Sequence, residues 1–349
     1  MPWSMGRPTV TDIAREAGVS LATVDRVLNA RPGVRAKTVA AVQEAVARLG
    51  YVRDMAAANL ARGRSTRVAI LLPDTESQFV QTLQDALEEA AALASSARMQ
   101  VDLRRYPASD MHLLAATLAD LAAGGISGVA LMAPETPVLR DALRGLHAAG
   151  VPVVAMVSDL PHSAAAHYVG IDSHAAGRTA AMLMGRFLGA RTPRVMVIAQ
   201  SMLLRDSIER RRGFDAVMQR DFPGIEVGQT LETHGAPETL REVMRLSLAS
   251  SGPVGGIYLL GSGHRALAQV LSELGLLGQV VTIGHELTPH TKAALQAGWM
   301  DAVIAQNVGH IARSTLRVLQ AKALQQPINE SQERLRLEII LRENLPHAS

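Results

Sequence analysis

The sequence predicts an α/β protein, with a small all-α unit at the N-terminus and a large body of two doubly wound parallel sheets. Three observations predict it. Basic side chains gather in the first 67 residues, a helix-turn-helix pattern occupies the first 50, and from residue 68 apolar runs alternate with helical stretches. The 349 residues suit about two domains and a small third, since a domain averages roughly 150 residues.

The first 50 residues predict three short helices. Polar capping candidates at 9–12 precede apolar residues at helical spacing, and Gly18 interrupts that pattern. Ser20 can cap a second helix, and a third follows Pro32-Gly33 and ends at Gly50. A helix, a short turn containing glycine and a second short helix are typical of a helix-turn-helix. The alternative is a generic three-helix bundle.

Charge and composition exclude several classes of protein and indicate what the N-terminal unit binds. Residues 1–67 hold 11 Arg/Lys and 5 Asp/Glu, a net +6, whereas the remainder carries −3, so the small unit is expected to bind a polyanion. The absence of cysteine excludes a disulfide scaffold and a thiolate zinc site, and 48% hydrophobic residues exclude a disordered chain. No apolar run approaches the roughly 20 residues that span a bilayer. With no signal-peptide pattern at its start, the chain is expected to be soluble, cytoplasmic and free of the membrane.

Residues 51–67 predict a linker rich in alanine and arginine. Within it, Ala56–Arg62 can form one or two helical turns before Gly63. So short a helix is marginal alone, so we expect it to become ordered on a partner.

From Val68 the body alternates strands and helices. The predicted strands are 68–72, 128–132, 151–155, 195–198, 256–260 and 280–283. The predicted helices are 81–94, 113–123, 139–149, 175–188, 211–220, 237–249 and 265–274. Such alternation implies parallel sheets covered on both faces, in two groups of units and therefore two lobes. A ligand site is expected at the carboxyl ends of their strands.

The headpiece motif carries a family resemblance. Residues 10–29 are VTDIAREAGVSLATVDRVLN, followed by Gly33-Val34-Arg35 and Gly50-Tyr51. This pattern closely resembles the headpiece of lactose-repressor (LacI) family regulators, and Leu60-Ala61-Arg62-Gly63 resembles their hinge helix. Weaker matches in the body are Val169–Asp172 before Ala176-Gly177-Arg178, Arg210 before Gly213-Phe214, and Ile304–Gln306.

The resemblance implies a domain plan and a fold. We expect a DNA-binding headpiece at 1–50, a hinge at 51–67 and an effector-binding domain at 68–349, similar to periplasmic sugar-binding proteins of type I. Its lobes are expected at about 68–167 with 306–326, and about 168–305 with 327–349.

For DNA, the resemblance implies a recognition helix whose first residues face base edges. Leu21 and Ala22 stand there and suit thymine methyl groups, whereas Arg26 can reach guanine. Asp25 departs from the serine usual in the family, so it either pairs with an arginine or discriminates between operators. Leu60 matches the wedge that enters the minor groove, or packs against its dimer mate. The positions that match phosphate-contacting residues are Thr9, Ser20, Thr23, Asn29 and Thr38.

For the effector, the resemblance places polar groups in the cleft between the lobes. Asp172 ends the crossover strand, Arg210 is the clamp arginine, and Phe79 is the aromatic after the first strand. Glu286 replaces the usual aspartate, and Gln306 matches a frequent glutamine. Such groups suit a small sugar or sugar derivative.

The chain is therefore predicted to be a homodimeric transcriptional repressor that binds double-stranded, pseudo-palindromic operator DNA and responds to a sugar-like effector. The alternative is a nicotinamide-dinucleotide-binding redox regulator or oxidoreductase, because Gly261-Ser-Gly-His-Arg-Ala266 fits G-x-G-x-x-A with Glu286 as the ribose acid. A stand-alone solute-binding protein would not need residues 1–67. The sequence shows no nucleophile elbow and no phosphate loop, so we predict no enzyme, no cofactor, no metal and no catalytic residue.

Overall fold

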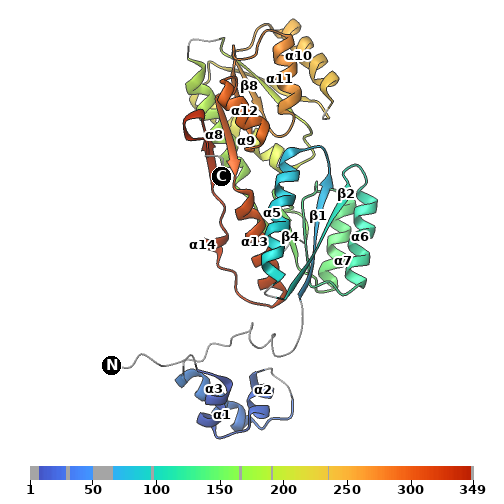
Figure 1. Cartoon of the computed structure of the whole chain (residues 1–349), viewed down its shortest axis with the longest axis vertical. Coiled ribbons are helices and arrows are strands. Elements are labelled where there is room, and N and C mark those ends of the chain that lie inside the picture. The colour runs from blue at the N-terminus through green and yellow to red at the C-terminus, as the bar shows by residue number, and fades with distance from the viewer. Residues whose placement is uncertain are drawn as a thin grey trace, which may run out of the picture. The chain divides into compact units, whose positions relative to one another are not determined.

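The computed structural model describes residues 8–28, 32–49, 66–95, 98–164, 167–189, 192–234 and 236–346. The chain divides into two compact units, Met1–Arg64 and Ser65–Ser349, which are drawn in Figure 1. Two of the predicted DNA-contacting residues, Asn29 and Leu60, lie outside the described residues, as does the predicted hinge helix.

The N-terminal unit contains α1 (Val10–Ala17), α2 (Leu21–Leu28) and α3 (Ala36–Leu49). A capping box starts α1, because the backbone N–H of Thr9 donates to the Asp12 carboxylate at 2.8 Å and the Thr9 hydroxyl accepts from the backbone N–H of Asp12. The predicted break at Gly18 is a left-handed cap with φ of 64°. Ile13, Val24 and Val42 are fully buried between the helices. The predicted helical unit is confirmed.

The first lobe of the large unit is a parallel sheet in the order β2-β1-β3-β4-β5. Its strands are β1 (Thr66–Asp74), β2 (Met99–Pro107), β3 (Gly128–Leu131), β4 (Val153–Met156) and β5 (His167–Val169). Its helices include α5 (Gln78–Ala94), α6 (Met111–Ala123) and α7 (Pro137–Ala148). The apolar runs of β1, β3 and β4 form its core.

The second lobe repeats the pattern in the order β11-β10-β9-β8-β6-β7, with β11 antiparallel to β10. Its strands are β6 (Arg194–Ala199), β7 (Glu226–Glu232), β8 (Gly256–Leu259), β9 (Val281–His285), β10 (Ala302–Gln306) and β11 (Leu337–Ile340). Its helices are α8 (Ser173–Leu188), α9 (Arg205–Asp221), α10 (Pro237–Ser251), α11 (His264–Glu273) and α12 (Pro289–Ala297).

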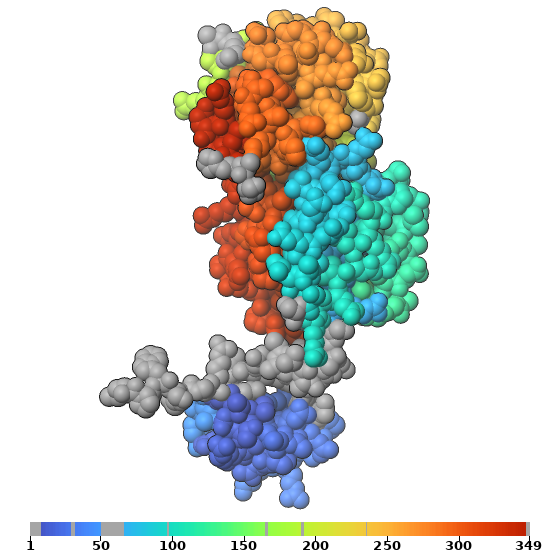
Figure 2. Space-filling view, viewed as in Figure 1, coloured from blue at the N-terminus to red at the C-terminus, as the bar shows by residue number. Residues whose placement is uncertain are grey.

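The chain passes between the lobes three times. It crosses from β5 to α8, and after β10 it returns through α13 (Val308–Ala323), which packs beside α5 on the first lobe (Figures 1 and 2). It then runs through α14 (Glu330–Glu333) to β11 and a short 3-10 helix, Arg342–Asn344. These crossings bring the strand ends of both sheets to one region, where the His290 N–H of α12 donates to the Gln78 side chain of α5 at 3.4 Å.

The predicted fold class is confirmed, and the six predicted strands correspond to β1, β3, β4, β6, β8 and β9. The strand β1 begins at Thr66, two residues earlier than predicted, because the Thr66 N–H donates to the Arg98 carbonyl. The edge strands β2 and β7 were not predicted, since their exposed and half-buried residues break the apolar run that marks a buried strand. Within the described part of the chain, no helix is long and apolar enough to cross a membrane.

Candidate functional site

Four polar side chains meet at the carboxyl edge of the second sheet. Asp206 and Arg210 lie one turn apart on α9, while Glu286 directly follows β9 and Gln306 ends β10. We call these four residues the acceptor cluster. All are buried, with Arg210 only 2% exposed and Asp206, the most exposed of them, at 8%. The site lies at the carboxyl ends of β9 and β10, the side of the sheet on which open α/β sheets bind ligands.

Arg210 organises the acceptor cluster. Its two terminal nitrogens donate to the Leu260 carbonyl at 2.7 Å and to Glu286 Oε1 at 3.0 Å, and the first also lies 3.5 Å from Asp206 Oδ2. Gln306 Nε2 donates to the same Glu286 oxygen at 2.9 Å. Burial opposes the charge of Arg210, but the two carboxylates raise its pKa, so it stays protonated.

Polar atoms of the cluster remain without a hydrogen-bond partner among the described residues. They are Asp206 Oδ1, Glu286 Oε2, Gln306 Oε1 and Arg210 Nε. Buried polar groups are nearly always paired, because an unpaired one costs about 1–3 kcal/mol. A group of such atoms at one sheet edge is therefore suited to hydrogen bonding with a polar ligand.

The backbone at Glu286 is strained. Its φ of 68° lies in the left-handed region, which is unfavourable for a residue with a side chain. The Thr291 hydroxyl, which donates to the Glu286 carbonyl at 2.8 Å, helps to hold this conformation. Such strain is common at ligand sites, where the surrounding structure fixes it. Burial raises the pKa of the Glu286 carboxyl above its usual value, against the opposing effects of Arg210 and Gln306.

Two glycines bring α9 close enough to place Arg210. A side chain at Gly177 of α8 would overlap the Arg210 carbonyl, and one at Gly213 of α9 would overlap the His174 carbonyl. The two helices therefore pack backbone to backbone. This contact gives a physical reason for the glycines in two of the body matches noted in the sequence.

Gly213→Ala should lower the free energy of unfolding by about 1–3 kcal/mol or more, because the added Cβ forces α8 and α9 apart. Urea denaturation of the full chain measures the loss. Gly145→Ala is the matched control, since a Cβ at this position of α7 meets nothing within 4 Å and alanine favours a helix. Equal stability of the two variants would contradict the close packing of α8 on α9.

Two buried histidines near the cluster predict a pH-dependent stability. Burial lowers the pKa of His264 to about 4, and burial together with the Arg210 charge lowers that of His285 well below its usual value. The unfolded chain binds these protons at about pH 6.5, so stability is complete above that pH and falls as the pH drops towards 4. Each histidine contributes at most about 1.4 kcal/mol per pH unit, and Glu286, with its raised pKa, offsets part of this loss.

Urea midpoints at several pH values between 7.5 and 5 test this prediction. His285→Gln should reduce the slope of stability against pH, even if it lowers stability at every pH. An unchanged slope in this variant would show that His285 does not remain neutral in the folded chain.

The structure separates the predicted effector residues into two groups. It brings Arg210, Glu286 and Gln306 together, whereas Asp172 is an exposed N-cap of α8 that accepts from the Ala175 N–H at 2.8 Å. Phe79 is 8% exposed and packs in the apolar core. Little of the Phe79 ring is therefore exposed for stacking against a ligand.

Sequence reasoning missed two neighbours of Arg210. Asp206 lies four residues before Arg210, a spacing that places both on one helix face and was available as a signal. The charges of Asp206 and Arg210 also act on the Tyr168 hydroxyl, whose pKa is raised mainly by burial. Tyr168 sits at the first crossing, and no sequence pattern pointed to it.

In the N-terminal unit, the outer face of α2 is exposed and carries Leu21, Ala22, Asp25 and Arg26. The hydroxyls predicted to contact phosphate also build the local structure. The Ser20 Oγ accepts from the Thr23 N–H at 3.2 Å and lies 2.9 Å from Thr23 Oγ1, while Thr9 caps α1. Thr38 is half-buried in the first turn of α3.

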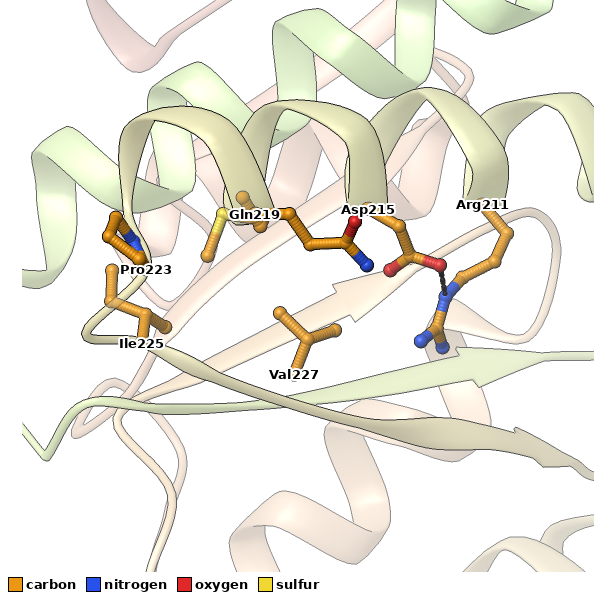
Figure 3. A pocket seen from close by; sticks show the side chains of 7 residues that line it. Arg211, Asp215, Gln219, Pro223, Ile225 and Val227 are labelled. Carbon is orange, nitrogen blue, oxygen red and sulfur yellow. Dashed lines mark hydrogen bonds and ion pairs between the residues drawn. The ribbon is translucent and has the colours of Figure 1, made fainter.

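A separate cavity of about 330 Å³ lies between α9 and the edge strand β7 (Figure 3). Figure 3 shows Arg211, Asp215 and Gln219 along one wall, with Ile225 and Val227 opposite. Arg211 donates to Asp215 at 2.7 Å, to the Thr230 hydroxyl at 2.8 Å and to the Gly228 carbonyl at 3.0 Å. Its charged groups are thus paired within the protein, whereas several polar atoms of the acceptor cluster have no partner among the described residues.

The glycine loop of the dinucleotide alternative does follow β8 and open α11. However, Ser262 hydrogen-bonds the Gln200 side chain, and the proposed ribose acid Glu286 is held by Arg210 and Gln306. Both side chains therefore already take part in hydrogen bonds within the second lobe. Among the described residues, no group of three or more His, Asp or Glu could hold a metal ion.

Comparison with known proteins identifies both units. Residues 68–327 match the family described as periplasmic binding protein domain. The chain belongs to this family. Residues 9–54 match the bacterial regulatory proteins, lacI family, which confirms the resemblance of the headpiece. The comparisons give no support to the redox alternative.

Relatives and solved structures agree with this assignment. Catabolite control protein A of Priestia megaterium is 35% identical over 106 residues, which cover 30% of this chain and 32% of that protein. The match therefore spans about a third of that relative's length. The structure of GanP, a glucose-galactose binding protein from Geobacillus stearothermophilus, aligns with a TM-score of 0.72 at 18% identity over 81% of this chain and all of its own. A putative LacI transcriptional regulator from Bacteroides fragilis aligns with a TM-score of 0.68 at 17% identity, covering 80% of this chain and 98% of its own. At these identities the two structures support the fold alone.

Proposed function

We propose that this protein is a transcriptional regulator, a repressor of carbohydrate-related genes, whose DNA affinity is controlled by a small sugar-like effector. The proposal rests mainly on one observation, namely that a single chain contains both a DNA-binding type of unit and a ligand-binding type of domain. A lacI-family unit with an exposed helix face precedes a binding-protein domain with a buried, partly unpaired polar cluster. Two similarities support the carbohydrate part of the proposal. One relative is a catabolite control protein, and one structural neighbour is a glucose-galactose binding protein.

The regulator acts on DNA as a cytoplasmic homodimer. Two headpieces place their α2 helices in successive major grooves of a pseudo-palindromic operator, where Leu21, Ala22 and Arg26 face the base edges. Thr9, Ser20, Thr23 and Thr38 face the phosphates, joined by Asn29, and Leu60 of the hinge wedges the minor groove. A ligand bound at the acceptor cluster shifts the relative position of the lobes, and this change alters the hinge. Such control requires different ligand affinities in the two states. No catalytic step is part of this proposal.

The DNA half of the proposal predicts a sequence preference. Repeated selection of a randomised duplex library with the full chain should enrich an inverted repeat. Arg26→Ala should weaken binding to the selected site by about 1–3 kcal/mol and relax the preference at one base pair of each half-site. A uniform loss of affinity on all sequences would reassign Arg26 to phosphate contact. Failure to enrich any sequence would refute the DNA-binding role.

A further inference from the structure

The acceptor cluster holds more negative than positive charge. It contains two carboxylates, Asp206 and Glu286, and one guanidinium, Arg210, whose terminal nitrogens already donate to Leu260 and Glu286. The neighbouring arginines of α9 form ion pairs with carboxylates outside the cluster. Arg205 and Arg212 pair with Glu209, and Arg211 pairs with Asp215. The cluster therefore offers little unbalanced positive charge to an incoming anion.

The unpartnered atoms of the cluster mostly accept hydrogen bonds. Asp206 Oδ1, Glu286 Oε2 and Gln306 Oε1 are acceptors, and the Arg210 Nε–H is the donor among them. A hydroxyl or an amine can donate to these oxygens, and a hydroxyl can also accept from Arg210. An ionised carboxylate or phosphate of a ligand brings further acceptor oxygens and negative charge towards buried carboxylates, which repel it.

We propose that the effector of this site is a donor-rich polyhydroxy compound, uncharged or carrying an amino group, and that the site discriminates against the corresponding sugar acids and sugar phosphates. Hydroxyls of the ligand donate to Asp206, Glu286 and Gln306, and one accepts from Arg210 Nε. This inference rests on the proposed function, because it names the chemical class of the effector. Arg210 is then a positioning residue for the acceptors more than a clamp for the ligand.

Isothermal titration calorimetry of the full chain with matched sugars tests the inference. Each series contains the neutral sugar, its amino derivative, its uronic acid and its phosphate, built on glucose, galactose, mannose and ribose where these derivatives exist. The neutral or aminated member of at least one series should bind about tenfold or more tightly than its acid and its phosphate. An acid or phosphate that binds as tightly as its neutral parent would overturn the inference and leave the proposed regulator intact.

Variants of the acceptor cluster test whether its residues cause the preference for neutral over anionic sugars. Glu286→Gln removes one carboxylate and should narrow the preference for neutral over anionic members. Glu209→Gln makes the same chemical change on α9 at a residue that pairs with Arg205 and Arg212, and should leave the preference unchanged. If Glu286→Gln does not fold, Asp206→Asn provides the same test. If the folded variant keeps the same preference for neutral over anionic sugars, the ligand does not bind at these carboxylates and the inference is overturned.

A second readout separates the inference from the proposed function. The same preparations are titrated with the selected operator DNA. If no sugar of any series binds while the operator still does, both the inference and the effector half of the proposed function fail, and the DNA half stands. Loss of operator selection with intact sugar binding would refute the regulator and leave the ligand class standing.

Discussion

Removal of residues 1–64 should abolish operator binding while the rest of the chain still folds. The first unit ends at Arg64, and β1 begins at Thr66, so the cut leaves both sheets complete. Because we propose that the lacI-family unit makes the base and phosphate contacts, specific affinity should fall by at least about a thousandfold in fluorescence anisotropy. The full chain should also lose affinity steeply with added salt, as expected for a basic unit that releases counterions.

A full-length variant separates loss of the unit from loss of its fold. Val24 is fully buried between the headpiece helices, so Val24→Asp places a carboxylate in that small core and should unfold it. This variant should bind operator no better than the truncated chain, and both should keep their affinity for sugar. Operator binding retained by residues 65–349 would refute the role of the headpiece.

Arg210→Met should be among the most destabilising single substitutions in the large unit. It leaves the Asp206 and Glu286 carboxylates buried without their cation, a change that typically costs about 3–5 kcal/mol. Urea denaturation of the full chain should show this loss, together with loss of effector binding. Arg212→Met is the matched control, since Arg212 is 61% exposed and pairs with Glu209 at the surface.

A second substitution tests the cause of that loss. Adding Glu286→Gln to Arg210→Met removes one of the stranded carboxylates, so the double variant should recover part of the lost stability. If the double variant is less stable than Arg210→Met alone, the cost does not arise from the uncompensated charge of Glu286.

The alternation of apolar runs and helices was enough to predict the fold class, because buried parallel strands such as β3 and β8 are uniformly apolar. The edge strand β7 escaped prediction because its side chains are only partly buried. The return of α13 to the first lobe depends on packing against α5, a contact between residues far apart in the sequence.

The candidate site was partly predictable for a similar reason. Glu286 directly follows β9 and Gln306 ends β10, and parallel strands carry their carboxyl ends to one edge. Asp206 lies among charged residues at the start of α9, where a solvated helix face is the ordinary expectation. Asp206 is buried because Gly177 and Gly213 allow α9 to pack closely against α8. The periodicity of the sequence alone does not reveal this packing.

A ligand at the acceptor cluster should change the affinity of the headpiece for DNA. The most direct measurement is the operator Kd of the full chain with and without a saturating amount of the sugar that binds best. We expect the operator Kd to change by about fivefold or more, and the sugar Kd must change by the same factor when operator is bound. Gln306→Leu, which weakens the sugar site, should move the response to higher sugar concentration. An operator Kd that is identical with and without bound sugar would show that the acceptor cluster does not control DNA binding.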